Sequence, residues 1–371
     1  MKIVSIVPRL FPIPGGPEKL IFNLSKTFAM LGHEAHVITQ EGEKPEFYKA
    51  FKFKVHYAPR FRHRAKYLLK HLLVIQIISK LLKIKPDVIH VHETPFLLSA
   101  LIYKHLFNKK CKIVLSTHYF FIGKTSLLNK FLFTLNMHLA PNVASVGKTM
   151  QKETKLLYGK GSYLVSLGLE VNKLRKLSAK EIIKTKKKYH IPEKRDVVLF
   201  LGRIVEQKGI DLALDSIAEV VKVKKNALYV LAGGGDAGYI AYLNRKIDEL
   251  NIRNNVKLIG QIPEDEITAV YSLADVFLTT TYWETMSISA LEALSCGLPV
   301  VTTDVGSMRD VVLDDYNGFV IPERKPEFFA GKILQVLKRK NRFSHNARKF
   351  AEKNLDLPKV TKGYLKLYET P

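Results

Sequence analysis

The chain has 371 residues, of which 47% are apolar, and a formal net charge of +25. At roughly 100–200 residues per domain, this length predicts two domains. The longest apolar runs, such as 96–103 and 71–78, are shorter than the ~18 apolar residues that a membrane-spanning helix needs, so no such helix is predicted. The start, MKIVSIVPRL, lacks the pattern of a secretory signal and predicts a first β-strand.

Short β-type runs alternate with amphipathic helical stretches along the chain, which is typical of parallel sheets wrapped by helices. The strands predicted in the first half are 2–7, 34–39, 53–58, 88–92, 112–118 and 142–147. After a polar, basic segment, the second half begins the pattern again with strands at 196–202, 227–235, 256–260, 275–280, 299–304 and 318–321. We therefore expect two doubly wound α/β domains, 1–170 and 171–352, with ligands bound by the loops that follow the strands.

A glycine turn follows the first predicted strand. Gly15 and Gly16 precede a helix in which Pro17 suits the first position and after which Gly32 suits the end. Backbone N–H groups exposed at such a helix start can bind an anion. Two adjacent glycines are also common in plain loops, so both interpretations stay open.

The positive charge is concentrated in the first half. Residues 1–170 hold 26 Lys/Arg and 9 Asp/Glu, and residues 47–152 hold nineteen Lys/Arg against two acids, Asp87 and Glu93. This imbalance indicates an anionic partner: nucleic acid, anionic lipid or a phosphorylated substrate. The segments 60–85 and 120–139 interrupt apolar stretches with cations, as helices at an anionic membrane surface do. Core-facing helices with solvated basic rims fit them equally well.

Histidine offers one candidate in the first half. His118 ends the predicted strand 112–118, where it could donate or accept a hydrogen bond with a substrate. A loop histidine bonded to the backbone is the alternative. His33, His90 and His92 have no such position and are interpreted as structural.

Two cations follow the first strand of the second half. Arg203 lies just past the strand 196–202, and Lys208 lies just before the next helix. Together they could clamp a diphosphate, Arg203 with its planar fork and Lys208 as a point charge. Two solvated loop cations are the alternative.

Two glutamates bracket a predicted helix start. Glu284 lies in the loop after the strand 275–280, Ser287 is suited to cap the helix that follows, and Glu292 falls on its second turn. Carboxylates accept hydrogen bonds from hydroxyls, and helix N-terminal amides hold phosphates, which are the two needs of a sugar nucleotide. A capping carboxylate with a surface glutamate would give the same pattern.

Several of these motifs together resemble the retaining glycosyltransferases of family 4, which have the GT-B fold. The resemblance covers nearly the whole chain and is carried by GGPE, KPDVIHVH, STH, LGRIVEQKGIDLAL and ETMSISALEALSCGLPVVTTD. Its most specific part is the pair of glutamates separated by seven residues and followed by a Cys-Gly-x-Pro-Val-Val run. The resemblance implies two Rossmann-like domains facing a central cleft, with a C-terminal helix, 353–371, that crosses back to the first domain.

The family's catalytic roles are carried over to four positions. Glu284 is expected to hydrogen-bond the transferred sugar, and Arg203 and Lys208 to neutralise the diphosphate as it leaves. His118 is expected to contact the sugar or the acceptor. The resemblance implies no metal and no cofactor, because the two cations replace a divalent ion, and the chain contains no Asp-x-Asp.

The donor-binding positions implied by the resemblance are Gly16, Thr285, Met286, Ser287 and Glu292. Glu292 would bind the ribose, and Gly16 would let the first domain's loop approach the phosphates or the acceptor. The family often has Glu-Gly-Phe-Gly where this chain has Glu-Thr-Met-Ser at 284–287. This departure leaves the choice of sugar open.

The expected function is metal-independent, retaining transfer of a hexose-type sugar from a UDP- or GDP-linked donor to a glycan or lipid acceptor. The distant Cys111 and Cys296 fit a reducing, cytoplasmic location, and the basic first half suggests peripheral attachment to the cytosolic face of a membrane. Another GT-B enzyme, such as a phosphorylase or a sugar-nucleotide epimerase, is the alternative. A nucleic-acid-binding protein is disfavoured, because the chain has no recognised module of that kind.

Overall fold

The computed structural model describes residues 1–13, 15–59, 73–116 and 127–370. The chain forms two compact units, Met1–Gly168 with Leu357–Pro371, and Leu169–Asp356. The domain limits expected from the sequence fall within a few residues of these. No helix in the described ranges is long and apolar enough to cross a membrane.

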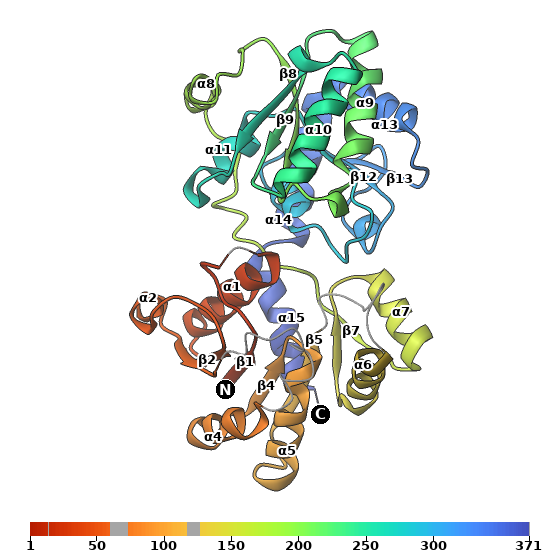
Figure 1. Cartoon of the computed structure of the whole chain (residues 1–371). Coiled ribbons are helices and arrows are strands. Elements are labelled where there is room, and N and C mark those ends of the chain that lie inside the picture. Colours follow the sequence, from red (N-terminus) through yellow and green to blue (C-terminus); the bar gives the residue numbers. More distant parts are fainter. Residues whose placement is uncertain (14, 60–72, 117–126, 371) are drawn as a thin grey trace. The chain divides into compact units, whose positions relative to one another are not determined.

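The first unit is built on a parallel sheet (Figure 1). Its strand order is β3-β2-β1-β4-β5-β6-β7. The strands are β1 (Lys2–Ile6), β2 (Glu34–Thr39), β3 (Lys54–Tyr57), β4 (Val88–Val91), β5 (Lys112–Ser116), β6 (Val143–Ser145) and β7 (Tyr163–Leu164). The inner strands are buried along most of their length because both faces of the sheet are covered by helices, although Ser5 in β1 and His90 in β4 interrupt their apolar runs. Ile3 pairs with both Ala35 and Val88, which places β1 between β2 and β4.

The helices of the first unit are α1 (Gly16–Met30), α2 (Pro45–Lys49), α4 (Val74–Ile84), α5 (Leu97–Leu106), α6 (Leu127–Leu139), α7 (Lys148–Tyr158) and α15 (Leu357–Glu369). The C-terminal helix α15 packs against α1, so the end of the chain returns to the first unit as expected. Tyr368 on α15 contacts His90 Nδ1 at 2.6 Å, and His90 Nε2 contacts Ser116 Oγ at 2.8 Å. These buried bonds confirm that His90 is structural.

The second unit repeats the architecture with a parallel sheet of order β10-β9-β8-β11-β12-β13 (Figure 1). The strands are β8 (Asp196–Leu201), β9 (Ala227–Ala232), β10 (Val256–Gly260), β11 (Val276–Thr279), β12 (Val300–Thr303) and β13 (Gly318–Ile321). The helices are α8 (Ala179–Lys188), α9 (Ile210–Val223), α10 (Ala237–Glu249), α11 (Ile267–Ser272), α12 (Ile288–Ser295), α13 (Pro326–Lys338) and α14 (Lys340–Asn354). All six strands lie where the sequence predicts them.

The strand order of the second sheet identifies where a ligand should bind. The first strand of the unit, β8, is flanked by β9 on one side and β11 on the other, so the winding reverses between β8 and β11. Ligands of open α/β sheets bind outside the carboxyl ends of the strands at such a switch point. The loop after β8 carries Arg203 and Lys208, and the loop after β11 carries Glu284.

Candidate active site

The loops after β8 and β11 meet at a glycine. Gly209 has a φ of +61°, and a Cβ there would lie 2.2 Å from the carbonyl oxygen of Thr280. Any side chain at this position would push the two loops apart, and it would also strain the left-handed backbone. Gly209 thus allows the loop that carries Lys208 to pack directly on the end of β11.

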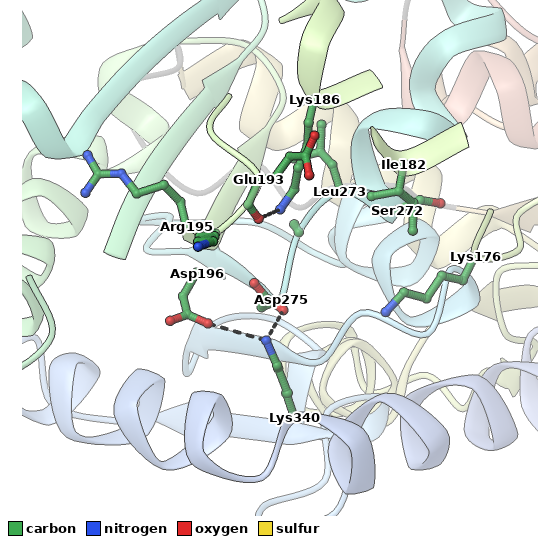
Figure 2. Close-up of a pocket in the computed structure, with 12 residues that line it drawn as sticks. Lys176, Ile182, Lys186, Glu193, Arg195, Asp196, Ser272, Leu273, Asp275 and Lys340 are labelled. Atoms are coloured by element: carbon green, nitrogen blue, oxygen red, sulfur yellow. Dashed lines mark hydrogen bonds and ion pairs between the residues drawn. The ribbon is translucent and has the colours of Figure 1, made fainter. Parts of the chain in front are cut away.

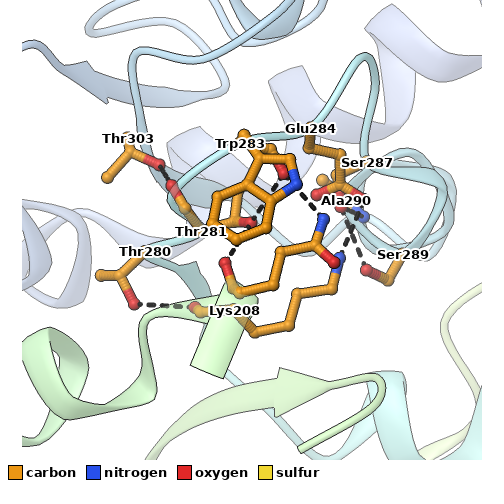
Figure 3. Close-up of polar contacts among 10 residues, drawn as sticks. Lys208, Thr280, Thr281, Trp283, Glu284, Ser287, Ser289, Ala290 and Thr303 are labelled. Carbon is orange, nitrogen blue, oxygen red and sulfur yellow. Dashed lines mark hydrogen bonds and ion pairs between the residues drawn. The ribbon is translucent and has the colours of Figure 1, made fainter. Parts of the chain in front are cut away.

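Three threonine hydroxyls fasten these loops together (Figure 3). Thr280 Oγ1 donates to Gly209 O at 2.6 Å, and Thr281 Oγ1 donates to Gln207 O at 3.0 Å. Thr303, at the end of β12, donates from Oγ1 to Thr281 O at 2.8 Å. All three threonines are buried. The carboxyl ends of β8, β11 and β12 are therefore held in one rigid arrangement.

Lys208 and Glu284 form the charged centre of this arrangement. Lys208 Nζ lies 2.9 Å from Glu284 Oε1, and the two side chains are only 14% and 18% exposed. The second carboxylate oxygen, Glu284 Oε2, is buried and has no hydrogen-bond partner among the residues that the structure describes. Buried polar atoms are almost always paired, so an unsatisfied one needs an explanation, and a ligand hydroxyl would supply the missing donor.

The backbone that carries Glu284 rests on the loop after β12. Ser307 N donates to Thr285 O at 2.8 Å. A Cβ on the preceding residue, Gly306, would lie 2.1 Å from Glu284 O, and Gly306 has a φ of +51°. The sequence gives no sign of this support, because it joins residues 22 positions apart, Thr285 with Ser307 and Glu284 with Gly306.

The predicted cap of α12 is confirmed. Ser287 is the N-cap residue, and its Oγ accepts a hydrogen bond from Ala290 N at 3.4 Å (Figure 3). Met286 and Ser287 are buried, whereas Thr285 is partly accessible. Of the three positions in which the chain departs from the family pattern, Thr285 is thus the one that a ligand reaches most easily.

Glu292 lies in α12 with only 5% of its surface exposed. Tyr271 OH donates to Glu292 Oε2 at 3.1 Å. Burial raises the pKa of Tyr271 well above its usual value, and the neighbouring Glu292 raises it further. The alternative of a surface glutamate is therefore wrong, because this carboxylate is enclosed and already holds one hydroxyl donor.

Arg203 does not join the Lys208–Glu284 pair in this structure. Its side chain is exposed and forms no ion pair within the described part of the chain. Only one of the two cations predicted to form a clamp is therefore built into the packed site. Arg203 remains in the loop after β8, at the same sheet edge.

The helix start at Gly16 lies in the first unit and holds a carboxylate of the chain itself. A Cβ on Gly15 would lie 2.0 Å from Glu18 Oε2, so the Glu18 side chain occupies the space beside the glycine turn. Glu18 is buried and pairs with Arg9 at 2.6 Å. A carboxylate of the chain itself therefore lies beside this helix start, and the binding of a phosphate there stays a prediction. His118 lies outside the described residues.

Two residues beside the site, Arg324 and Trp283, are not among the site residues predicted from the sequence. Arg324, three residues after β13, donates from Nη2 to Thr281 O at 3.2 Å and to Tyr282 O at 2.9 Å, and its guanidinium lies 4.7 Å from the Tyr282 ring centroid. Burial and a hydrogen bond to Asp211 raise the pKa of Tyr282 to about 12. The position of Arg324 after a strand end was a usable signal. The exposed Trp283 ring beside Glu284 also gave a signal, as the chain's one tryptophan.

A separate pocket of about 280 Å³ lies at the amino ends of the strands of the second sheet, opposite to the carboxyl ends that carry Lys208 and Glu284 (Figure 2). It adjoins Asp196, which begins β8, and Asp275, which precedes β11. Lys340 Nζ lies 3.0 Å from Asp275 and 3.4 Å from Asp196. Asp196 and Asp275 are thus paired with Lys340. The place of this pocket at the amino ends of the strands separates it from the Lys208–Glu284 site.

Comparison with known proteins agrees with this architecture. The family model described as Glycosyltransferase Family 4 matches residues 14–165, and the one described as Glycosyl transferases group 1 matches residues 181–353. An uncharacterised glycosyltransferase of Methanocaldococcus jannaschii is 26% identical over 91% of this chain and 89% of its own length. The alpha-monoglucosyldiacylglycerol synthase of Acholeplasma laidlawii is 23% identical over 86% of this chain and 84% of its own.

Among solved structures, HepE of Anabaena in complex with UDP-glucose superimposes with a TM-score of 0.82, at 20% identity and with 100% of both chains covered. The fold, the two family models and the relatives define the chain as a glycosyltransferase of the GT-B fold. Within that class it is a family 4-like glycosyltransferase, matched over nearly its whole length. The resemblance found in the sequence is thereby confirmed for the fold, the family and the class of enzyme.

Proposed function

We propose that this glycosyltransferase takes a sugar from a nucleoside diphosphate donor bound at the carboxyl edge of the second sheet. The observation that carries the proposal is the Lys208–Glu284 pair at the topological switch point, where one carboxylate oxygen has no hydrogen-bond partner within the described ranges. A sugar hydroxyl is the donor that this oxygen lacks. Binding of UDP-glucose by HepE, which shares the fold, supports a UDP-linked donor.

The proposed reaction breaks the bond between the sugar and the diphosphate, so negative charge develops on the leaving phosphate. Preorganised positive groups aimed at such charge are usually the largest catalytic contribution. Lys208 is fixed by its pair with Glu284, and Arg203 lies exposed in the same loop, free to close on the phosphates. Glu292 is proposed to bind the ribose, and Thr285 to contact the sugar. No metal enters this proposal.

The acceptor is proposed to be a lipid with an anionic or phosphate-bearing headgroup. The name of the Acholeplasma relative indicates a glycolipid product for that protein, and the basic first half of this chain would attract an anionic acceptor. Retention of the anomeric configuration is also proposed. It can be tested by NMR of the anomeric proton in the first product formed.

A panel of UDP-, GDP- and ADP-linked sugars tests the donor directly. A ligand that binds only the folded protein raises its melting temperature by mass action. We expect one nucleotide sugar to stabilise the protein, and the replacement Glu292→Gln to weaken that effect. If no member of the panel stabilises a correctly folded sample, the proposed donor class is wrong.

A further inference from the structure

Most of the exposed large apolar side chains of the described residues belong to the first unit. The largest group of them on one helix lies on the outer face of α6. Leu127 and Phe131 are 84% and 63% exposed, and Leu128, Leu135 and Leu139 are exposed as well. These side chains recur at intervals of three to four residues, so they form one stripe along the helix. The opposite face of α6 buries Phe133 and Met137 in the core. The helix is therefore apolar on both faces.

An apolar stripe in water is costly, since burying a leucine or phenylalanine side chain gains about 1.5–3 kcal/mol. A contiguous exposed apolar surface usually marks an interaction site. The neighbouring helix α7, which packs against α6, adds the exposed Leu156 and Leu157 at its carboxyl end. Lys160, just after α7, is bonded to the end of α6, because its Nζ donates to His138 O at 2.7 Å and to O of Ala140, the residue that follows α6.

The charges around the stripe are positive. Lys130 on α6 and Lys152 and Lys155 on α7 are exposed. Between Glu93 and Glu170 the sequence contains a single acid, Glu153. An apolar stripe flanked by lysines has the composition of a helix that lies in the headgroup region of an anionic bilayer. A nucleic acid would use the lysines but would leave the leucines and Phe131 exposed to water.

We infer that the outer face of α6, together with the lysines of α7, is a docking surface for an anionic lipid bilayer. The helix lies flat, with its leucines and Phe131 among the acyl chains and the lysines at the phosphates. This inference rests on the proposed function, because a lipid acceptor must be collected from a membrane. It adds to that function the segment that makes the contact.

Flotation with vesicles of phosphatidylcholine, with and without phosphatidylglycerol, tests the surface. We expect binding only when phosphatidylglycerol is present, and weaker binding at high salt. Phe131→Ser with Leu135→Ser should reduce binding at least about tenfold, because two apolar side chains no longer transfer out of water. The matched control is Val223→Ser with Phe328→Ser, two exposed apolar residues of the second unit, and it should bind like the wild type.

Charge reversal and a local probe complete the test. Lys152→Glu with Lys155→Glu should weaken binding, whereas Lys184→Glu with Lys187→Glu on α8 should affect it much less. Both native cysteines are buried, so an introduced cysteine can be labelled selectively with an environment-sensitive dye. A dye at Leu135→Cys should shift to the blue on binding, and a dye at Val223→Cys should not.

Two outcomes would overturn the inference. The first is vesicle binding that the Phe131/Leu135 variant retains in full. The second is a dimer of the wild type in solution that becomes monomeric in this variant, which would assign the stripe to a second copy of the chain. The nucleotide-sugar panel separates this inference from the proposed function. Stabilisation by a donor without vesicle binding refutes only the docking surface. Vesicle binding through α6 without stabilisation by any donor refutes only the proposed donor.

Discussion

Replacement of Lys208 by methionine removes the positive charge but keeps most of the side-chain volume. Loss of one preorganised group that stabilises developing charge lowers turnover by roughly 10²-fold or more, equivalent to about 3 kcal/mol in the barrier. The same change leaves the Glu284 carboxylate without its ion-pair partner. Breaking a fully buried pair costs about 3–5 kcal/mol, and because both side chains here keep some exposure we expect about 2 kcal/mol. At the size of this unit, that corresponds to a fall of about 4–8 °C in melting temperature.

A double variant separates the two effects. Adding Glu284→Gln to Lys208→Met removes the unpaired charge, so the melting temperature should recover in part while turnover stays low. The control is Lys222→Met, which breaks a solvent-exposed pair with Glu219 in the same unit and should change neither quantity. Turnover is measured as release of nucleoside diphosphate, and stability by thermal unfolding. Near-normal turnover of Lys208→Met, or recovery of turnover in the double variant, would refute the assignment of Lys208 to the diphosphate.

Three further predictions concern other positions. Glu292→Gln should raise the Kd for the nucleotide sugar about tenfold in a calorimetric titration, as loss of one charged hydrogen bond does, and an unchanged Kd would place the ribose elsewhere. Gly306→Ala should lower both activity and melting temperature, because its Cβ would lie 2.1 Å from Glu284 O, whereas Gly331→Ala, which meets nothing within 4 Å inside α13, should be neutral or stabilising. Burial lowers the pKa of His56 to about 4, so its neutral form is favoured in the folded state. Stability should therefore fall by about 2 kcal/mol as the pH drops from 6.5 to 4, and a His56→Gln variant that shows the same fall would contradict this.

Much of the fold could be predicted because buried parallel strands leave a clear pattern in sequence. Twelve strands were predicted, and each corresponds to a strand of the structure within a few residues. Among the residues that the structure describes, β7 is the one strand not predicted, since its two residues, Tyr163 and Leu164, are too few to show a period and lie exposed at the sheet edge. The Ser287 cap was also predictable, because capping depends on neighbours three residues away.

Contacts between distant segments could not be predicted from one sequence. The pairing of Lys208 with Glu284 joins residues 76 apart, and it changes Lys208 from a free cation into a member of a partly buried pair. The bond from Tyr271 to Glu292 likewise depends on how α11 and α12 pack. Glu18 can be seen in the sequence three residues after Gly15, but the sequence does not show that its side chain turns back toward this glycine. Composition could indicate a basic surface in the first unit, whereas the exposed stripe on α6 required coordinates.

The most direct test of the central claim is release of nucleoside diphosphate from nucleotide sugars by the wild type and by Lys208→Met, measured side by side with phosphatidylglycerol vesicles as acceptor surface. The account predicts release from one donor by the wild type, reduced roughly 10²-fold in the variant. Equal release by the two proteins, or none from any donor by a correctly folded wild type, would contradict it.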